Sequence, residues 1–514
     1  MPPLLGTLLS QGLKLGKRAT RKNRDLFALQ KNELLKMLKT ARHTQFGNHY
    51  HFDEILQRFS NKTDKEFYDW YKSRVPVFTY NKIDEEWWYK LRAGEKNVCW
   101  PGVVRYFALS SGTSESSSKY IPLTKDLIKA NKRTGVRQIL SLAHYDLPKG
   151  LLGKGILMLG GSTELQKSEH YYAGDLSGIQ TGKIPFWFNY FYKPGRDIAK
   201  TKDWNQKLEE ITLSAKDWDI GFLVGVPAWI QLLMEKIISH YKVKHIHEIW
   251  PNLEVFVHGG VSFEPYKKGF EKLLGKPITY IETYLASEGF LAFQALPTLH
   301  SMRLQVDNGI FFEFVPFNDE NFNSEGELVF NPKTIMIDEV EEGIDYAILI
   351  TTNAGAWRYM IGDTVRFVDK KEAEIIITGR TKHFLSVCGE HLSVDNMNKA
   401  VQMVSEEFNI SIREFTVSGI PFGTMFAHQW YLGVEGKVDK EKLCKRLDEC
   451  LCLLNDDYRT ERTSALKEVL LEVLPLETFY DFMKKRGKIG GQSKFPRVMK
   501  KVMYDEWRQF VQHG

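Results

Sequence analysis

The sequence predicts an α/β fold with a large N-terminal domain and a smaller α+β C-terminal domain. From residue 103 to about 378, short apolar runs bounded by glycine, proline or asparagine alternate with helical segments, which is typical of layered α/β architecture. After residue 380 longer helical segments return. Because 514 residues exceed the size of one hydrophobic core, more than one domain is expected.

Each predicted element follows from its local pattern of apolar and turn-forming residues. The first part has predicted strands at 155–159, 220–224, 253–257 and 278–281, and predicted helices at 125–144, 227–240 and 265–274. Five closely spaced strands, at 310–315, 327–330, 346–351, 364–368 and 375–378, predict an antiparallel sheet or a small β-barrel-like part. The last part has predicted helices at 394–408 and 440–454, with strands at 414–418 and 429–434.

Composition limits the environment and the partners of the chain. Five cysteines among 514 residues fit a reducing compartment, so a cytoplasmic location is expected. Apolar stretches end within about ten residues, short of the ~20 that cross a bilayer. The net charge of +6 permits a small anionic substrate and does not require nucleic acid. We therefore expect neither a membrane nor a nucleic-acid partner, and the oligomeric state is left open.

The most informative segment is residues 110–119, Ser-Ser-Gly-Thr-Ser-Glu-Ser-Ser-Ser-Lys. It follows an apolar run that is predicted as a buried strand. Hydroxyls and free backbone amides at the end of a strand can surround phosphate oxygens, and Lys119 adds a positive charge. The alternative is a solvated serine-rich turn.

Two later motifs place a carboxylate at the end of a strand. Glu288, in Ala-Ser-Glu-Gly, is a candidate ligand for Mg²⁺, which is commonly held beside phosphates by only one or two carboxylates. Asp363, in Tyr-Met-Ile-Gly-Asp, has two acceptor oxygens that suit the two hydroxyls of a ribose. Taken alone, each motif is more typical of an ordinary turn.

Together the three motifs resemble those of adenylate-forming enzymes, which make an acyl-AMP from a carboxylic acid and ATP. Within that superfamily the chain resembles the acyl acid amido synthetases of the auxin-responsive Gretchen Hagen family, especially the bacterial members. The resemblance extends over nearly the whole chain. The matching segments are 109–114, 118–122, 286–290, 311–316, 359–363, 379–384, 454–458 and 487–497.

Some positions depart from the plant pattern. Glu115 stands where plant members usually carry glycine, and Met360 and Ile361 interrupt the plant Tyr-Arg-x-Gly-Asp form. Recognition of auxin or jasmonate therefore does not carry over from these motifs.

The resemblance implies an adenylate-forming domain over residues 1–380, a mobile lid over 381–514 and a hinge at about 379–385. It implies ATP and Mg²⁺ as cofactors, with Glu288 as metal ligand. Lys119 would hold the phosphate tail, and Lys494 would bridge the carboxylate and the α-phosphate. The residues implied to bind ATP are Ser110, Ser111, Gly112, Thr113, Ser114, Ser287, Tyr359, Asp363 and Arg380.

The reaction implied is adenylation of a carboxylic acid, followed by attack of an amino acid amine that gives an amide, AMP and pyrophosphate. Two alternatives stay open: an acyl-CoA ligase that uses the same adenylate, and a protein that binds a nucleotide or acyl acid without turnover. The aromatic-rich stretch at 171–192 either lines the acyl pocket or belongs to the core. Neither the acid, the amine nor the base that deprotonates the amine can be named from the sequence.

Overall fold

A computed structural model describes residues 25–58, 65–111, 118–182, 184, 186–260, 263–323, 326–381, 384–435, 438–486, 495–499 and 501–513. These residues fall into two compact units. The first unit comprises those up to Leu109 and those from Tyr120 to Thr381. The second comprises those from Ser110 to Lys119 and those from Lys382 onward.

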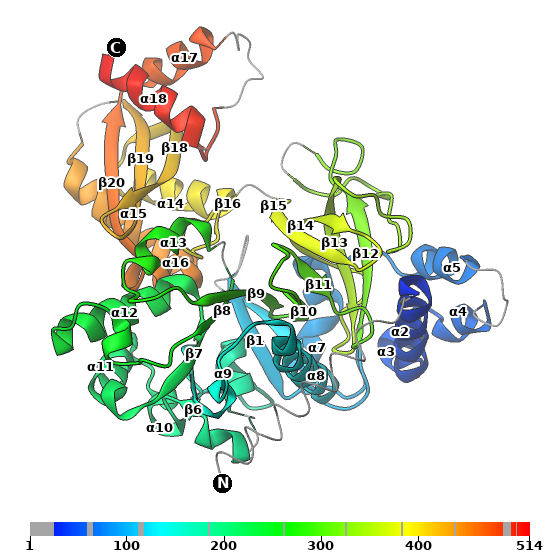
Figure 1. The fold of residues 1–514 in the computed structure, drawn as a ribbon. Coiled ribbons are helices and arrows are strands. Elements are labelled where there is room, and N and C mark those ends of the chain that lie inside the picture. The colour runs from blue at the N-terminus through cyan, green and yellow to red at the C-terminus, as the bar shows by residue number, and fades with distance from the viewer. Residues whose placement is uncertain are drawn as a thin grey trace. The chain divides into compact units, whose positions relative to one another are not determined.

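An eleven-stranded sheet among the described residues belongs to the first unit, in the order β12-β13-β14-β15-β11-β10-β9-β8-β7-β3-β6 (Figure 1). Strands β6, β3, β7, β8 and β9 pair in parallel, and the pairing from β9 to β12 is antiparallel. The predicted α/β class is confirmed. The bounds are β3 (Gly155–Met158), β6 (Tyr192–Lys193), β7 (Ile220–Gly225), β8 (Val255–Gly259), β9 (Thr279–Ala286), β10 (Gly289–Phe293), β11 (Met302–Leu304), β12 (Ile310–Pro316), β13 (Asp345–Thr352), β14 (Tyr359–Asp369) and β15 (Glu374–Arg380).

The antiparallel strands do not form a sheet of their own, because β10 and β11 join them to the parallel strands. The strand predicted at 327–330 is absent, and only an isolated bridge links Leu328 to Phe322. Leu328 packs against a small cluster of buried residues, but the side chain of Phe330 is fully exposed. A short apolar run is therefore insufficient evidence for a strand where only part of the run is buried.

A smaller sheet has the order β2-β1-β5-β4, with β1 (Tyr106–Ser111), β2 (Ser118–Leu123), β4 (Gln166–Lys167) and β5 (Tyr172–Gly174). Tyr171 packs edge-on against Phe107 and Tyr120 beside this sheet, whereas Tyr192 is buried in β6 of the large sheet. The aromatic stretch at 171–192 is thus divided between two sheets.

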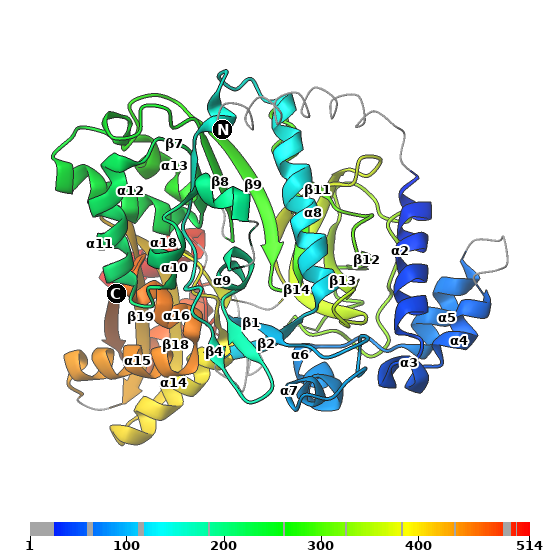
Figure 2. The same cartoon turned by 90° about the horizontal axis from the view of Figure 1, so that it is seen from below.

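Helices cover both sheets of the first unit. Figures 1 and 2 show α11, α12 and α13 gathered beside β7 and β8, with α8 apart from them along β10. The bounds are α2 (Leu26–Ala41), α3 (Gln45–His49), α4 (Phe52–Arg58), α5 (Glu66–Arg74), α6 (Tyr80–Ile83), α7 (Tyr89–Arg92), α8 (Lys125–Ser141), α9 (Leu176–Thr181), α10 (Arg196–Lys200), α11 (Trp204–Ser214), α12 (Pro227–Tyr241) and α13 (Glu264–Glu271).

A buried ion pair fixes the start of β14, the strand that carries the third motif. The Arg358 Nε lies 3.0 Å from Glu313 Oε1, and both side chains are almost fully buried. The same guanidinium donates to the carbonyl of Val75 at 2.7 Å, just after α5. Because a buried charge without its partner is costly, this contact holds β14 against β12 and the end of α5.

The second unit is an α+β fold built on the sheet β18-β19-β20. Aromatic side chains from α17, α18 and the chain before α18 form one of its cores, including Phe479, Phe495 and Trp507. The bounds are β16 (Phe384–Leu385), β17 (Leu392–Ser393), α14 (Val394–Glu407), β18 (Ser411–Phe422), β19 (Met425–Glu435), α15 (Lys440–Leu454), α16 (Asp456–Thr463), β20 (Leu466–Leu474), α17 (Leu476–Lys485) and α18 (Lys501–His513).

None of the helices in the described part of the chain combines the length and the apolar character that a membrane span requires.

Candidate active site

Glu288 lies in the tight turn between two antiparallel strands. Ala286 at the end of β9 pairs with Gly289 at the start of β10, so Ser287 and Glu288 form a two-residue hairpin turn. The Glu288 side chain is not left in solvent, because only 8% of the residue is exposed. A buried carboxylate requires partners, and Glu288 has one in Tyr359.

Asp363 projects from an irregular part of β14. Residues 361–363 lie opposite the single residue Ile348 of β13, because Ala347 pairs with Thr364 while Leu349 pairs with Met360. Gly362 in this bulge has a φ of +93°, a conformation that favours glycine. Bulges change the direction of a side chain, which explains why Gly-Asp occurs at this point of the strand.

Tyr284, Asp363 and Arg380 form a compact group, which we call the first trio. The Tyr284 hydroxyl donates to Asp363 Oδ2 at 2.6 Å, and Arg380 Nε lies 2.8 Å from Asp363 Oδ1. Asp363 and Arg380 are direct neighbours in the register of β14 and β15. Sequence reasoning predicted the aspartate and the arginine but gave Tyr284 no role. The available signal was its place on β9, four residues before Glu288.

Tyr359 supports the carboxylate of Glu288. Its phenol donates a hydrogen bond to Glu288, and burial together with the charge of Glu288 raises the pKa of Tyr359 well above its usual value. Its ring is 1% exposed and packs against Trp88, with 5.4 Å between ring centroids. Tyr359, predicted to bind ATP, therefore contacts Glu288 from within the core.

The structure brings the second and third motifs together. Glu288, Asp363 and Arg380 all act electrostatically on Tyr284, and Glu288 and Arg380 also act on Tyr359. Motifs more than 70 residues apart in the sequence thus share one cluster of side chains.

The first motif is described only in part. Ser110 and the backbone of Ser111 end β1, and Lys119 lies in β2. Tyr120, the next residue, donates its backbone N–H to the Tyr80 hydroxyl at 2.9 Å, and Tyr80 is an electrostatic neighbour of Tyr359. The remaining predicted residues Gly112, Thr113, Ser114 and Lys494 lie outside the described residues.

The cluster has the chemistry of a nucleotide site. A carboxylate can accept about four hydrogen bonds, and among the described residues Asp363 contacts only Tyr284 and Arg380. It can therefore also accept from a diol. No three His, Cys, Asp or Glu side chains of the described residues are arranged to hold a metal ion. A single carboxylate such as Glu288 nevertheless fits Mg²⁺, which takes most of its ligands from phosphate and water.

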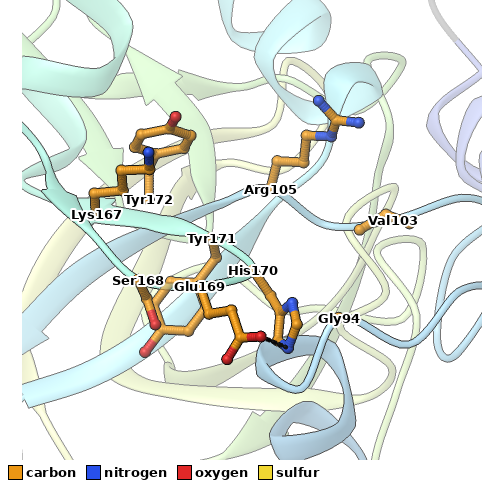
Figure 3. A pocket seen from close by; sticks show the side chains of 9 residues that line it. All are labelled: Gly94, Val103, Arg105, Lys167, Ser168, Glu169, His170, Tyr171 and Tyr172. Atoms are coloured by element: carbon orange, nitrogen blue, oxygen red, sulfur yellow. Dashed lines mark ion pairs between the residues drawn. The ribbon is translucent and has the colours of Figure 1, made fainter.

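A separate pocket of about 310 Å³ is lined by residues near β4 and β5. The residues predicted to bind ATP or metal are not among them, but Tyr171 and Tyr172, from the aromatic stretch at 171–192, are. Figure 3 shows Arg105 and Lys167 on opposite sides of this pocket, so their charges do not converge. Glu169 lies 3.9 Å from His170 within it. A second pocket, on the second unit, is lined by Arg446, Asp448 and Arg459 among others, and these charged side chains pair with neighbouring side chains.

Comparison with known families identifies matches along most of the chain. Residues 17–214 and 163–278 match the GH3 family N-terminal domain. Residues 304–376 match the GH3 family central domain, and residues 395–502 match the GH3 family C-terminal domain.

Individual relatives agree with these matches. The chain is 23% identical to a probable indole-3-acetic acid-amido synthetase GH3.1 of Arabidopsis thaliana, over 87% of this chain and 86% of the relative. It is 24% identical to a jasmonoyl-L-amino acid synthetase GH3.5 of Oryza sativa subsp. japonica, over 75% of each chain.

Two solved structures share the fold. A GH3.15 acyl acid amido synthetase in complex with 2,4-DB matches with a TM-score of 0.56 and 18% identity, over 99% of this chain and 96% of that one. A 2-hydroxyisobutyryl-CoA ligase in complex with 2-HIB-AMP and CoA matches with a TM-score of 0.57 and 11% identity, over 96% and 93%.

Proposed function

Because this chain belongs to the GH3 (Gretchen Hagen) family, we propose that it joins a small carboxylic acid to an amino acid through an acyl-adenylate formed from ATP. The observation that carries this proposal is the shared cluster of Glu288, Asp363 and Arg380. It provides one carboxylate for a metal and one for a ribose in the same unit, as adenylation requires.

The first half-reaction brings together two anions. A carboxylate oxygen of the acid attacks the α-phosphorus of ATP, the bond to the β-phosphate breaks, and pyrophosphate leaves with its negative charge. Positive groups must therefore gather around the phosphates. Lys119 and the hydroxyls and amides of residues 110–114 hold the phosphate tail. Lys494 neutralises the approaching carboxylate.

Magnesium is the expected cation at Glu288. When bound it neutralises charge on the phosphates, and Tyr359 keeps the Glu288 carboxylate in place for it. Asp363 accepts hydrogen bonds from the ribose hydroxyls and so fixes the nucleoside end of ATP. Arg380 adds a positive charge beside the ribose and the α-phosphate.

In the second half-reaction an amine attacks the acyl carbonyl, an amide forms and AMP leaves. The acyl-adenylate is sensitive to water, so a lid that closes over it protects it. The change of compact unit between Thr381 and Lys382 supports a hinge at about 379–385, between an adenylation domain over 1–380 and a lid over 381–514.

An amine is preferred to coenzyme A as the acceptor because the relatives that match at length are named as an acid-amido synthetase and a jasmonoyl-L-amino acid synthetase. The CoA ligase matches at 11% identity, which supports the fold and not the acceptor.

The test is release of pyrophosphate from Mg-ATP with a library of carboxylic acids, scored with each amino acid and with CoA. We expect an acid-dependent signal, and an amide product with an amino acid. A thioester as the sole product would overturn the choice of acceptor. Absence of acid-dependent pyrophosphate release across the library would overturn the proposed reaction.

The role of Lys494 can be tested in the same assay. Lys494→Ala is expected to slow adenylation at least about a hundredfold, because it removes charge stabilisation in the transition state. Binding of ATP, measured by calorimetry, is expected to remain nearly unchanged. Unchanged pyrophosphate release would remove Lys494 from the catalytic machinery.

A further inference from the structure

We propose that Tyr284 is a positioning residue that makes the site selective for a ribonucleotide over a deoxyribonucleotide, by holding the Asp363 carboxylate in the orientation that reads the ribose hydroxyls. This inference rests on the proposed function, since it assigns Asp363 to the ribose of ATP. It adds a residue that the nucleotide motifs do not assign to this task.

The contact itself is short and sheltered. The Tyr284 hydroxyl lies 2.6 Å from Asp363 Oδ2, and only 6% of Tyr284 is exposed. Hydrogen bonds to an ionised carboxylate are stronger than those between neutral groups. The bond therefore restricts the rotation of a side chain that stands on a bulge, where the backbone ladder alone does not determine its direction.

Tyr284 is suited to this task because it remains a neutral donor. Burial, together with the charge of Asp363, raises the pKa of Tyr284 well above its usual value. The phenol is therefore a donor near neutral pH, and the Asp363 carboxylate accepts from it with lone pairs left for a ligand. Arg380 at Oδ1 and Tyr284 at Oδ2 hold the two oxygens from different strands.

The second unit contains a matched group, Tyr458, Asp448 and Arg462, which we call the second trio. The Tyr458 hydroxyl donates to Asp448 Oδ1 at 2.7 Å, and Tyr458 is fully buried. Here Arg462 is bidentate, with Nε 2.9 Å from Oδ1 and Nη2 2.8 Å from Oδ2. Tyr458→Phe therefore removes the same kind of bond at a place where the proposed reaction has no ligand.

The experiment measures the dissociation constants of ATP, 2′-deoxy-ATP and 3′-deoxy-ATP by calorimetry with the full chain and magnesium. The wild type is expected to bind ATP more tightly than either deoxy form. In Tyr284→Phe the ratio of the dissociation constant of each deoxy-ATP to that of ATP is expected to fall roughly tenfold. This is the effect of losing one hydrogen bond to a charged group. Tyr458→Phe is expected to lower the melting temperature and leave the ratio unchanged.

A double-mutant cycle separates positioning from a direct contact. In an Asp363→Asn background, Tyr284→Phe should produce no further change in the ratio, because Tyr284 acts through Asp363. A ratio in Tyr284→Phe equal to that of the wild type overturns the inference. So does an additive effect in the Asp363→Asn background, or a wild type that binds the three nucleotides equally.

Failure of the proposed function has a different signature. If the wild type binds no ATP and releases no pyrophosphate with any acid, the adenylation proposal fails first. If the wild type is active but Tyr284→Phe retains full selectivity, only the role of Tyr284 is lost. If Tyr284→Phe does not fold, the inference is tested with Asp363→Asn. Full retention of the selectivity for ATP over the deoxy forms in that variant overturns the inference.

Discussion

The two trios use the same three residue types and differ in how the arginine meets the aspartate. In the second trio, Arg462 contacts both oxygens of Asp448 and also donates to the Leu466 carbonyl. In the first trio, Arg380 and Asp363 form an ion pair whose closest atoms, Nε and Oδ1, lie 2.8 Å apart. Their aspartates are similarly accessible, with side chains 16% and 22% exposed.

Exposure alone therefore does not distinguish a structural aspartate from one that is available to a ligand. A bidentate arginine uses the directions in which a carboxylate accepts best, and Asp448 also receives a phenol. Asp363 receives a phenol on one oxygen and keeps acceptor capacity. The first trio is therefore suited to binding a ligand, and the second is suited to holding α15 against α16 and β20.

The largest expected effect compares Asp363→Ala with Asp448→Ala. Asp363→Ala should lower kcat/KM for ATP about a hundredfold or more, because two hydrogen bonds from the ribose to a charged group are lost. Asp448→Ala should leave turnover per folded molecule unchanged and lower the free energy of unfolding by about 2 kcal/mol, since Arg462 and Tyr458 lose their acceptor. Pyrophosphate release and urea unfolding measure the two quantities.

The comparison of the two trios would be wrong if each variant showed the effect that is expected of the other. Loss of turnover in folded Asp448→Ala would mean that the second trio serves the reaction. Strong destabilisation of Asp363→Ala with normal turnover would mean that the first trio is structural.

A second prediction concerns Glu390, a carboxylate of the second unit. Like Asp448, it accepts hydrogen bonds from several internal partners. It lies 2.8 Å from His428 Nε2, and both side chains are fully buried. Burial alone would raise the pKa of Glu390, but the hydrogen bond and charge of His428 and the N–H groups of Cys388 and Val387 lower it from 4.5 to about 2.

Because the folded pKa is below the ordinary one, Glu390 stabilises the fold fully above about pH 4.5. This contribution is lost as the pH falls toward 2, and is on the order of 3 kcal/mol. Glu390→Gln should therefore be less stable than the wild type at pH 7, with a difference that shrinks toward pH 2. Urea unfolding at several pH values measures it, and a difference independent of pH would contradict the assignment.

A third prediction extends the comparison to Glu288, the other carboxylate of the first cluster. Tyr359→Phe removes the phenol that supports it and should weaken Mn²⁺ binding in the presence of ATP roughly tenfold, the usual effect of losing a partner behind a metal ligand. Electron paramagnetic resonance of free Mn²⁺ reports this without turnover.

Tyr71→Phe is the matched control for that measurement. The Tyr71 hydroxyl is also buried and lies 2.6 Å from Thr351 Oγ1, with no metal ligand as its partner. It should change stability and leave Mn²⁺ binding unaltered. Equal loss of Mn²⁺ binding in both variants would show that Tyr359 acts only through the stability of the core.

Periodicity predicted the elements better than the site. Helix α15 begins and ends at the predicted residues, and α8, α12, β3 and β7 lie within a few residues of their predicted bounds. These elements carry a strong local pattern of buried residues. The predicted strand at 327–330 failed because burial of an apolar run depends on what packs against it, and nothing covers Phe330.

For the site, sequence motifs indicated Glu288, Asp363 and Arg380 and omitted the tyrosines as supports. The Tyr284 contact depends on the bulge at residues 361–363, and the Arg380 contact depends on the register between β14 and β15. Both are properties of strand pairing, which local sequence does not specify. The motifs indicated the residues that we propose to act on a ligand, whereas the residues that contact those residues could be identified only from the fold.

The smallest expected effect concerns His391 and Asp457, a pair in the second unit that remains partly exposed. Nδ1 of His391 lies 2.9 Å from Asp457 Oδ2, and the side chains are 27% and 35% exposed. Exposed ion pairs contribute about 0 to 1 kcal/mol. His391 has a φ of +39°, which asparagine tolerates better than most residues. His391→Asn should therefore change the free energy of unfolding by less than about 1 kcal/mol.

Urea unfolding tests that value, and a loss above about 2 kcal/mol would show that the pair is structural like the second trio. Amide formation from a supplied acyl-adenylate, measured on the same protein, is the sharper test of the comparison. If His391→Asn is stable but forms amide slowly, the pair of His391 and Asp457 in the second unit is also available to a ligand. The distinction would then be between carboxylates whose acceptor positions are all used by internal partners and carboxylates that keep acceptor positions for a ligand. It would no longer be between the two units.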